Sequence, residues 1–151
     1  MAEILFEDFV DFLDALNKSE TEYLVVGGYA VVYHGYHRTT GDLDIWVNRT
    51  EANYKLLLKA FAIFGMPIFD MTLSNFLDVD KFDVFKFGKS PVRIDVLTAC
   101  KGLVFEEAFH QSAKVTFDGV QVNMIDVRDL IKAKKAAGRY KDLDDIEHLE
   151  G

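Results

Sequence analysis

Cysteine and proline are scarce in this chain of 151 residues, which has one cysteine and two prolines. The single cysteine, Cys100, has no second cysteine for an internal disulfide, so the fold does not depend on a disulfide framework. We expect Cys100 to pack in the core or at a strand end. Few prolines together with 50% hydrophobic residues are typical of a globular domain, and they exclude a disordered linker.

Positive charge is also in short supply, and long apolar runs are missing. Lysine and arginine number 17 against 25 acidic residues, which gives a formal net charge of -8. Sequence-independent binding of nucleic acid needs an excess of basic residues, so we expect none. No run reaches the roughly 20 apolar residues of a membrane span, and acidic residues interrupt the first 16 positions where a signal peptide would be apolar. We therefore expect one cytoplasmic domain, residues 1–151, without membrane contact.

The spacing of apolar residues predicts a mixture of helices and strands. Residues 5–17 show helical spacing, residues 22–28 form a short apolar strand that stops at two glycines, and residues 29–35 form a short helix. We predict an α+β fold in which helices flank a central mixed or antiparallel β-sheet. The other expected elements are a strand over 42–47, a helix over 51–64 between Thr50 and Gly65, antiparallel strands over 81–88 and 91–99, a short helix over 104–112, a hairpin turning at Asp118 and Gly119, and two tail helices separated by Gly138.

Two aspartates lie one residue apart at the start of the strand expected over 42–47. Side chains alternate along a strand, so Asp42 and Asp44 share one face about 7 Å apart. Two like charges repel at that distance unless a cation lies between them, and hard divalent ions such as Mg²⁺ prefer carboxylate oxygens. Asp95 interrupts another apolar strand and adds a third carboxylate if the two strands are neighbours. The alternative is that one or more of the three are ordinary edge-strand aspartates.

A pair of glycines, Gly27 and Gly28, separates the first expected strand from the helix that follows it. The free backbone N–H groups and the dipole of a helix start favour an anion such as phosphate. A tight turn that needs glycine torsion angles is the alternative. A glycine turn followed after 13 residues by Asp42 and Asp44, and later by Asp95, indicates a site for a nucleotide and metal.

The stretch "GGYAVVYHGYHRTTGDLDIWV", residues 27–47, resembles the signature of DNA polymerase beta-type nucleotidyltransferases. That signature is a strand, Gly-Gly or Gly-Ser, a helix, and two aspartates alternating with apolar residues. The chain resembles more closely the small bacterial AbiEii-like and minimal nucleotidyltransferases, and the tail "DLIKAKKAAGRYKDLDDIEHL" is similar to theirs. The resemblance spans residues 22 to 150. Larger members append a helical domain that helps hold the base or the acceptor, which leaves the acceptor site of this chain unassigned.

This resemblance implies an activity, a cofactor and a set of catalytic residues. The activity is transfer of a nucleoside monophosphate from an NTP to an unidentified acceptor hydroxyl, with release of pyrophosphate. The cofactor is a pair of Mg²⁺ or Mn²⁺ ions, held by the catalytic carboxylates Asp42, Asp44 and Asp95. Gly27 and Gly28 would bind the β- and γ-phosphates.

Lys134 faces the apolar side of the first tail helix, between Val127, Leu130 and Ile131. A lysine in that position either extends its apolar stem outward or meets buried negative charge. The family's L-I-x-x-K pattern aligns with Lys134. That alignment favours contact with phosphate or carboxylate.

Other polar residues are candidates for contact with the nucleotide. Arg38 and Thr40 precede the aspartate strand, close to the expected triphosphate, although a solvent-exposed loop is the alternative. Arg139, Lys141 and Asp142 follow the family's G-R-x-K-D pattern, which fits structural pairing as well as substrate contact.

A binding role is the alternative to catalysis. The protein would then be a nucleotidyltransferase-like antitoxin of a toxin–antitoxin pair, or a regulatory partner, that keeps NTP affinity but acts on another protein. Three intact carboxylates favour the enzyme. The small size favours a protein partner or a homo-oligomer that completes the acceptor surface. A structural domain with a vestigial site is the third hypothesis.

Overall fold

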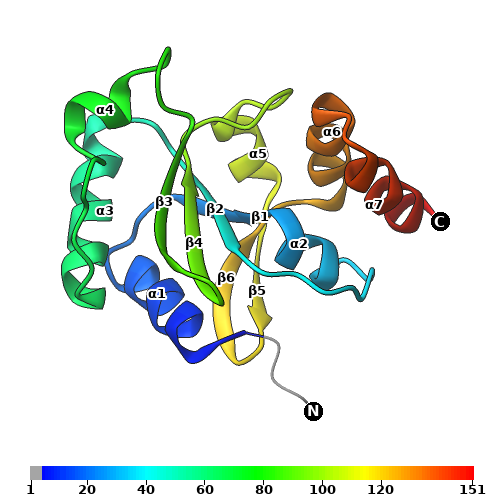
Figure 1. Ribbon diagram of the computed structural model, residues 1–151, viewed down its shortest axis with the longest axis horizontal. Coiled ribbons are helices and arrows are strands. Elements are labelled where there is room, and N and C mark those ends of the chain that lie inside the picture. The colour runs from blue at the N-terminus through cyan, green and yellow to red at the C-terminus, as the bar shows by residue number, and fades with distance from the viewer. Residues whose placement is uncertain (1–4) are drawn as a thin grey trace.

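A six-stranded mixed β-sheet forms the centre of the protein in the computed structural model, which describes residues 5–151 (Figure 1). The strand order is β3-β4-β2-β1-β6-β5. The pairs β1–β2, β3–β4 and β5–β6 are antiparallel, whereas β1–β6 and β2–β4 are parallel. This arrangement confirms the predicted mixed sheet. The strands are β1 (Tyr23–Val26), β2 (Leu43–Val47), β3 (Val84–Lys89), β4 (Val92–Leu97), β5 (Ala113–Phe117) and β6 (Val120–Met124).

Helices flank this sheet, as the sequence predicted. On one face, Phe61 of α3 meets Phe12 of α1 and Phe87 of β3 edge-on. Phe105 of α5 meets Trp46 of β2 on the opposite face. Figure 1 shows α6 and α7 side by side, away from α3. Within residues 5–151, no helix combines the length and the apolar character needed to cross a membrane. The helices are α1 (Glu7–Lys18), α2 (Gly27–Tyr33), α3 (Glu51–Phe64), α4 (Leu73–Leu77), α5 (Phe105–Gln111), α6 (Val127–Ala137) and α7 (Tyr140–Glu150).

Local signals in the sequence account for the ends of α3 and for the β5–β6 turn. The Thr50 side chain accepts a hydrogen bond from the Asn53 backbone N–H, and Gly65 ends α3 with φ +84°. Asp118 and Gly119 both have positive φ, as a two-residue hairpin turn requires. Helix α4 lies in residues 66–79, where the sequence pattern predicts no element, because five residues are too few to show helical periodicity.

The strand register decides which side chains meet at the candidate site. Val26, at the end of β1, lies opposite Asp44 in the antiparallel neighbour β2. Asp44 in turn lies opposite Asp95 in β4, and Asp95 lies opposite Lys86 in β3. The end of β1, and so the start of α2, therefore lies beside the paired carboxylates.

Candidate active site

Asp44 and Asp95 lie next to each other on one face of the sheet, as register partners on the parallel strands β2 and β4. Asp42 precedes β2 and has the same strand parity as Asp44, and one of its carboxylate oxygens lies 3.9 Å from Nε of Arg93. The predicted adjacency of the two aspartate strands is therefore present, and Asp42 is held toward Arg93.

Burial and mutual repulsion raise the pKa values of the two paired carboxyls. Burial, followed by the charge of Asp95, a hydrogen bond with Asp95 and the charge of Asp42, raises the pKa of Asp44 to about 7. Burial and then the charge of Asp42 raise the pKa of Asp95, against the lowering effects of Lys86 and Arg93. The site thus carries more negative charge than its protein surroundings neutralise.

The carboxylates suit a divalent cation by their chemistry. Oδ1 of Asp95 is buried and has no hydrogen-bond partner among the described residues, although most buried carboxylate oxygens have one. Carboxylate oxygens are the ligands that Mg²⁺ prefers. As they stand, however, no three acidic, histidine or cysteine side chains of residues 5–151 form a group that could hold a metal ion. The two-ion site therefore stays a prediction.

Both glycines at the start of α2 are required by close contacts. Gly27 has φ +67°, and a Cβ atom there would collide with the Asp44 carboxylate. A Cβ atom on Gly28 would collide with the side chain of Thr40. The torsional explanation therefore holds for Gly27, but the approach of Asp44 and Thr40 is a second reason for glycine. The backbone N–H groups of the first turn begin at this point, so the predicted phosphate role keeps its geometric basis.

Lys134 is buried, with 7% of its surface exposed, which confirms that it points inward. Its Nζ lies 3.3 Å from Asp142 and 3.0 Å from Asp145. Arg38 donates two hydrogen bonds to Asp145, at 2.8 and 3.0 Å. Arg139 donates to Asp142 from Nε and Nη2. The sequence left contact of Lys134 with phosphate or with carboxylate open, and the structure contains the contact with carboxylate. Arg139 and Asp142 form a structural pair.

These five side chains, Arg38, Lys134, Arg139, Asp142 and Asp145, form what we call the tail charge cluster. Burial alone would raise the pKa of Asp142, but hydrogen bonds from Arg139 and the charge of Lys134 hold it below its usual value. The pKa of Asp145 is likewise lowered, against burial, by Arg38 and Lys134. Three cations against two anions leave a formal charge of one positive unit in this cluster.

A cavity of about 220 Å³ lies between the glycine turn and the tail charge cluster. It brings together the glycine turn, one catalytic carboxylate and the buried lysine, which the sequence assigned to one site. The thiol of Cys100 also lines the cavity. Burial raises the pKa of this thiol to about 11, so it stays protonated at neutral pH. The polar and glycine residues of the wall include Gly27, Asp44, Cys100, Lys134 and Arg139.

Arg38 and Thr40 line a different hollow, of about 530 Å³, together with Tyr29 and His37. They flank the glycine turn from its other side, because a Cβ atom on Gly28 would lie next to both. The predicted nucleotide-binding residues therefore line two hollows, which Arg38 links through its ion pair with Asp145, the partner of Lys134.

Asp145 is the site residue that the sequence did not single out. It is 1% exposed and bridges Arg38 to Lys134. The sequence signal that could have identified Asp145 is its position on the same face of the tail helix as Ile146 and Asp142, which are also buried. An acid on a buried helix face needs a cationic partner.

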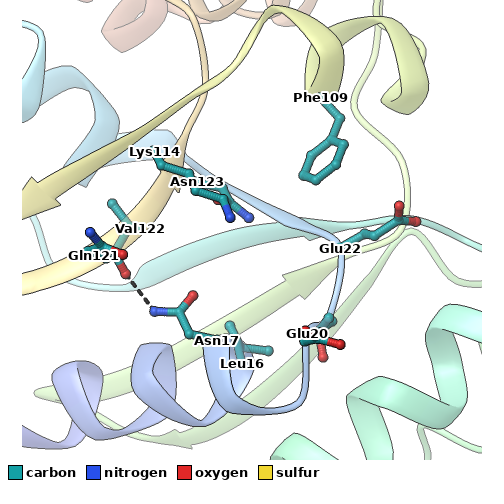
Figure 2. Close-up of a pocket in the computed structure, with 10 residues that line it drawn as sticks. Leu16, Asn17, Glu20, Glu22, Phe109, Lys114, Gln121, Val122 and Asn123 are labelled. Atoms are coloured by element: carbon teal, nitrogen blue, oxygen red, sulfur yellow. Dashed lines mark hydrogen bonds between the residues drawn. The ribbon is translucent and has the colours of Figure 1, made fainter.

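A further cavity, of about 340 Å³, lies at the opposite end of β1 from the glycine turn (Figure 2). Its polar wall includes Glu22, which immediately precedes β1, and Lys114 and Asn123 of the β5–β6 hairpin. Asn17 donates a hydrogen bond of 2.7 Å to the backbone carbonyl of Gln121 there. This cavity includes none of the predicted site residues.

A glycine turn against paired strand carboxylates defines a class of proteins that transfer nucleotides. The chain belongs to the family described as "Nucleotidyl transferase of unknown function (DUF2204)", whose model matches residues 5–151. The prediction of a nucleotidyltransferase enzyme is thereby confirmed at the level of the family, and the binding-protein alternative gains no support. The closer resemblance to AbiEii-like members stays a prediction.

One solved structure shows the same fold. It is the crystal structure of the lincosamide antibiotic adenylyltransferase LnuA with lincomycin bound. The TM-score is 0.64 at 14% sequence identity, and the match covers 99% of each chain. This likeness confirms the nucleotidyltransferase-like fold. No curated protein matches the sequence.

Proposed function

We propose that the protein transfers a nucleoside monophosphate from an NTP to the hydroxyl group of an acceptor and releases pyrophosphate. The observation that carries the proposal is the contact between the glycine turn and the carboxylates. Gly27 approaches Asp44 so closely that a Cβ atom would collide with its carboxylate, and Asp44 is the register partner of Asp95. A phosphate at the turn and the reacting groups at the carboxylates would thus be neighbours.

The chain's own groups divide into a phosphate side and a carboxylate side. The backbone N–H groups of Gly27 and Gly28 would bind the β- and γ-phosphates. An anion there would lie beside the negative charge of Asp44, which favours a cation shared between them. We propose that Asp42, Asp44 and Asp95 hold two Mg²⁺ or Mn²⁺ ions. Such ions, when bound, neutralise phosphate charge and lower the pKa of an attacking hydroxyl.

In the reaction, the acceptor oxygen forms a bond to the α-phosphorus. The bond from the α-phosphorus to the bridging oxygen breaks, and pyrophosphate leaves with the electron pair. The acceptor's proton passes to a carboxylate, for which Asp95 is our candidate. The positive tail charge cluster lies across the 220 Å³ cavity from the glycine turn, so Lys134 would offset charge that develops on the leaving group.

The acceptor is the least defined part of the reaction. The structure of LnuA contains lincomycin, a small molecule, so a small-molecule acceptor is one candidate for this chain. The end of a tRNA and a hydroxyl group of a protein are the others that we would test.

The test is transfer of label from each α-³²P NTP, with Mg²⁺ or Mn²⁺, to small molecules, tRNA or the proteins of a cell extract. We expect transfer to be lost in Asp42→Ala and Asp95→Ala and kept in Asp11→Asn, which changes an exposed acid on α1. Saturable NTP binding without transfer to any acceptor pool would instead support the binding role. If Mg²⁺ with NTP fails to raise the melting temperature, the nucleotide site itself is wrong.

A further inference from the structure

A larger cavity, of about 610 Å³, adjoins the candidate active site one step further along β2 and β4. Trp46 lines it, and Trp46 has the strand parity of Asp44, about 7 Å further along β2. The backbone segment 99–101 separates this cavity from the 220 Å³ cavity and lines both. Its volume lies within the range of roughly 300 to 1,000 Å³ that is usual for small-molecule sites.

Two hydrogen-bond donors in the wall of this cavity lack acceptors. Buried side-chain N and O atoms without a partner number four in the described chain, and Trp46 Nε1 and Arg49 Nε are two of them. Arg49 is fixed in place, because its Nη2 donates to the carbonyl of Phe82 and to Oγ1 of Thr98. Unpartnered buried donors are rare in folded proteins, and two in one wall indicate that an acceptor atom is missing. A ligand oxygen that reaches either atom after a small shift of the wall would supply the missing acceptor.

The charges around the cavity do not select an ion. Arg49 and Lys101 are balanced by Asp83 and Glu106 in the same wall. Leu103 and Val104 supply apolar surface in this wall, and the buried rings of Trp46 and Phe105 lie behind it with centroids 5.1 Å apart and planes at 86°. A polynucleotide would bring several phosphates to a neutral wall, in a chain whose net charge is already -8. The wall instead suits an uncharged molecule with a planar apolar part and a carbonyl oxygen.

We propose that the 610 Å³ cavity binds the acceptor, a small uncharged molecule whose carbonyl oxygen accepts from Trp46 or Arg49, and whose hydroxyl extends past segment 99–101 toward the paired carboxylates. The inference rests on the proposed function, because it assigns the second substrate of that reaction. Trp46 is only 2% exposed, so its N–H becomes accessible when the wall shifts.

The test uses Trp46 as a built-in reporter, since it is the one tryptophan of the sequence. The probe is prodan, an uncharged naphthalene ketone whose absorption overlaps tryptophan emission. We expect saturable energy transfer from Trp46 to prodan. MgATP at saturation should change the affinity for prodan by less than twofold, because the nucleotide and the acceptor molecule must be bound at the same time.

Two matched variants separate this cavity from unspecific apolar binding. Val104 lines the cavity and is 55% exposed, whereas Val79 is 65% exposed and lies outside its wall. Val104→Arg adds bulk and charge at the rim and should weaken prodan at least tenfold. Val79→Arg should change it less than twofold. Trp46→Phe, followed by prodan's own emission, should weaken binding about fivefold through loss of one hydrogen bond.

Several results would overturn the assignment. If energy transfer from Trp46 to prodan does not saturate, or if prodan binds equally well to both arginine variants, the cavity binds no such ligand. Competition by MgATP means that the cavity belongs to the nucleotide, and competition by oligoadenylate means that the acceptor is a polyanion. None of these readouts requires catalysis. Prodan binding with the expected variant effects, in a protein that transfers no label, would therefore place the failure in the proposed function alone.

Discussion

Replacing Lys134 by methionine removes the buried cation that Asp142 and Asp145 share, while it keeps an apolar stem of similar length. Breaking a buried ion pair by removing one partner costs about 3 to 5 kcal/mol, because it leaves uncompensated charge. Asp142 keeps Arg139 and Asp145 keeps Arg38, so we place the loss of unfolding free energy at the lower end, about 3 kcal/mol.

The effect of Lys134→Met should depend on pH with a defined sign. The pKa values of Asp142 and Asp145 are lowered in the folded protein. Their stabilising contribution is therefore present above the ordinary aspartate pKa of about 3.9 and is lost as the pH falls through the folded-state values. In the variant these carboxyls lose a cation, so their folded-state pKa values rise and they bind protons at higher pH. The difference between the two proteins should shrink from pH 7 to pH 4.

Urea unfolding at pH 7 and pH 4, without nucleotide, measures both effects. The control is Lys135→Met in the same helix, because Lys135 forms an exposed pair with Glu150 at 3.5 Å and should contribute less than about 1 kcal/mol. A loss at pH 7 that equals the control, or a loss that stays the same at pH 4, would refute the idea that Lys134 neutralises buried carboxylates.

Two further predictions concern the glycine turn and the paired carboxylates. Gly27→Ala should destabilise the protein by at least about 1 kcal/mol more than Gly65→Ala in urea unfolding, because φ is +67° and +84° at the two glycines but only Gly27 has Asp44 against it; equal losses would show that torsion alone requires glycine. Asp44→Asn should abolish transfer yet raise the unfolding free energy at pH 8 by about 1 kcal/mol or more, since burial and repulsion raise the pKa of this carboxyl to about 7. That gain should vanish near pH 4, where the wild-type carboxyl is protonated, and a gain that persists there contradicts the electrostatic cause.

The sequence predicted those features that depend on neighbouring residues. Alternation along β2 placed Asp44 and Trp46 on the face opposite Leu43 and Ile45, and glycine and threonine marked the ends of α3. Helical spacing turned Lys134 inward. In each case the physical signal lies within a few residues of the element that it specifies.

Features that depend on contacts between distant segments could not be predicted from the sequence. Asp44 and Asp95 become neighbours only because β4 pairs with β2 in parallel, and the intervening β3 lies at the sheet edge. No local pattern states that order. The sequence could not identify the partner of Lys134 for the same reason, since Asp145 belongs to another helix. That the N–H groups of Trp46 and Arg49 lack acceptors can be seen only in the folded structure, because it depends on which residues surround them.

The bridge through Asp145 also bears on when the protein becomes active during its synthesis. Asp145 holds Arg38 although 107 positions separate them in the chain. A nascent polypeptide that already contains the glycine turn and all three carboxylates would still lack this anion, and Arg38 and Lys134 would repel each other. Closing so long a loop costs chain entropy that local contacts do not. The tail charge cluster should therefore be complete only after α7 has left the ribosome.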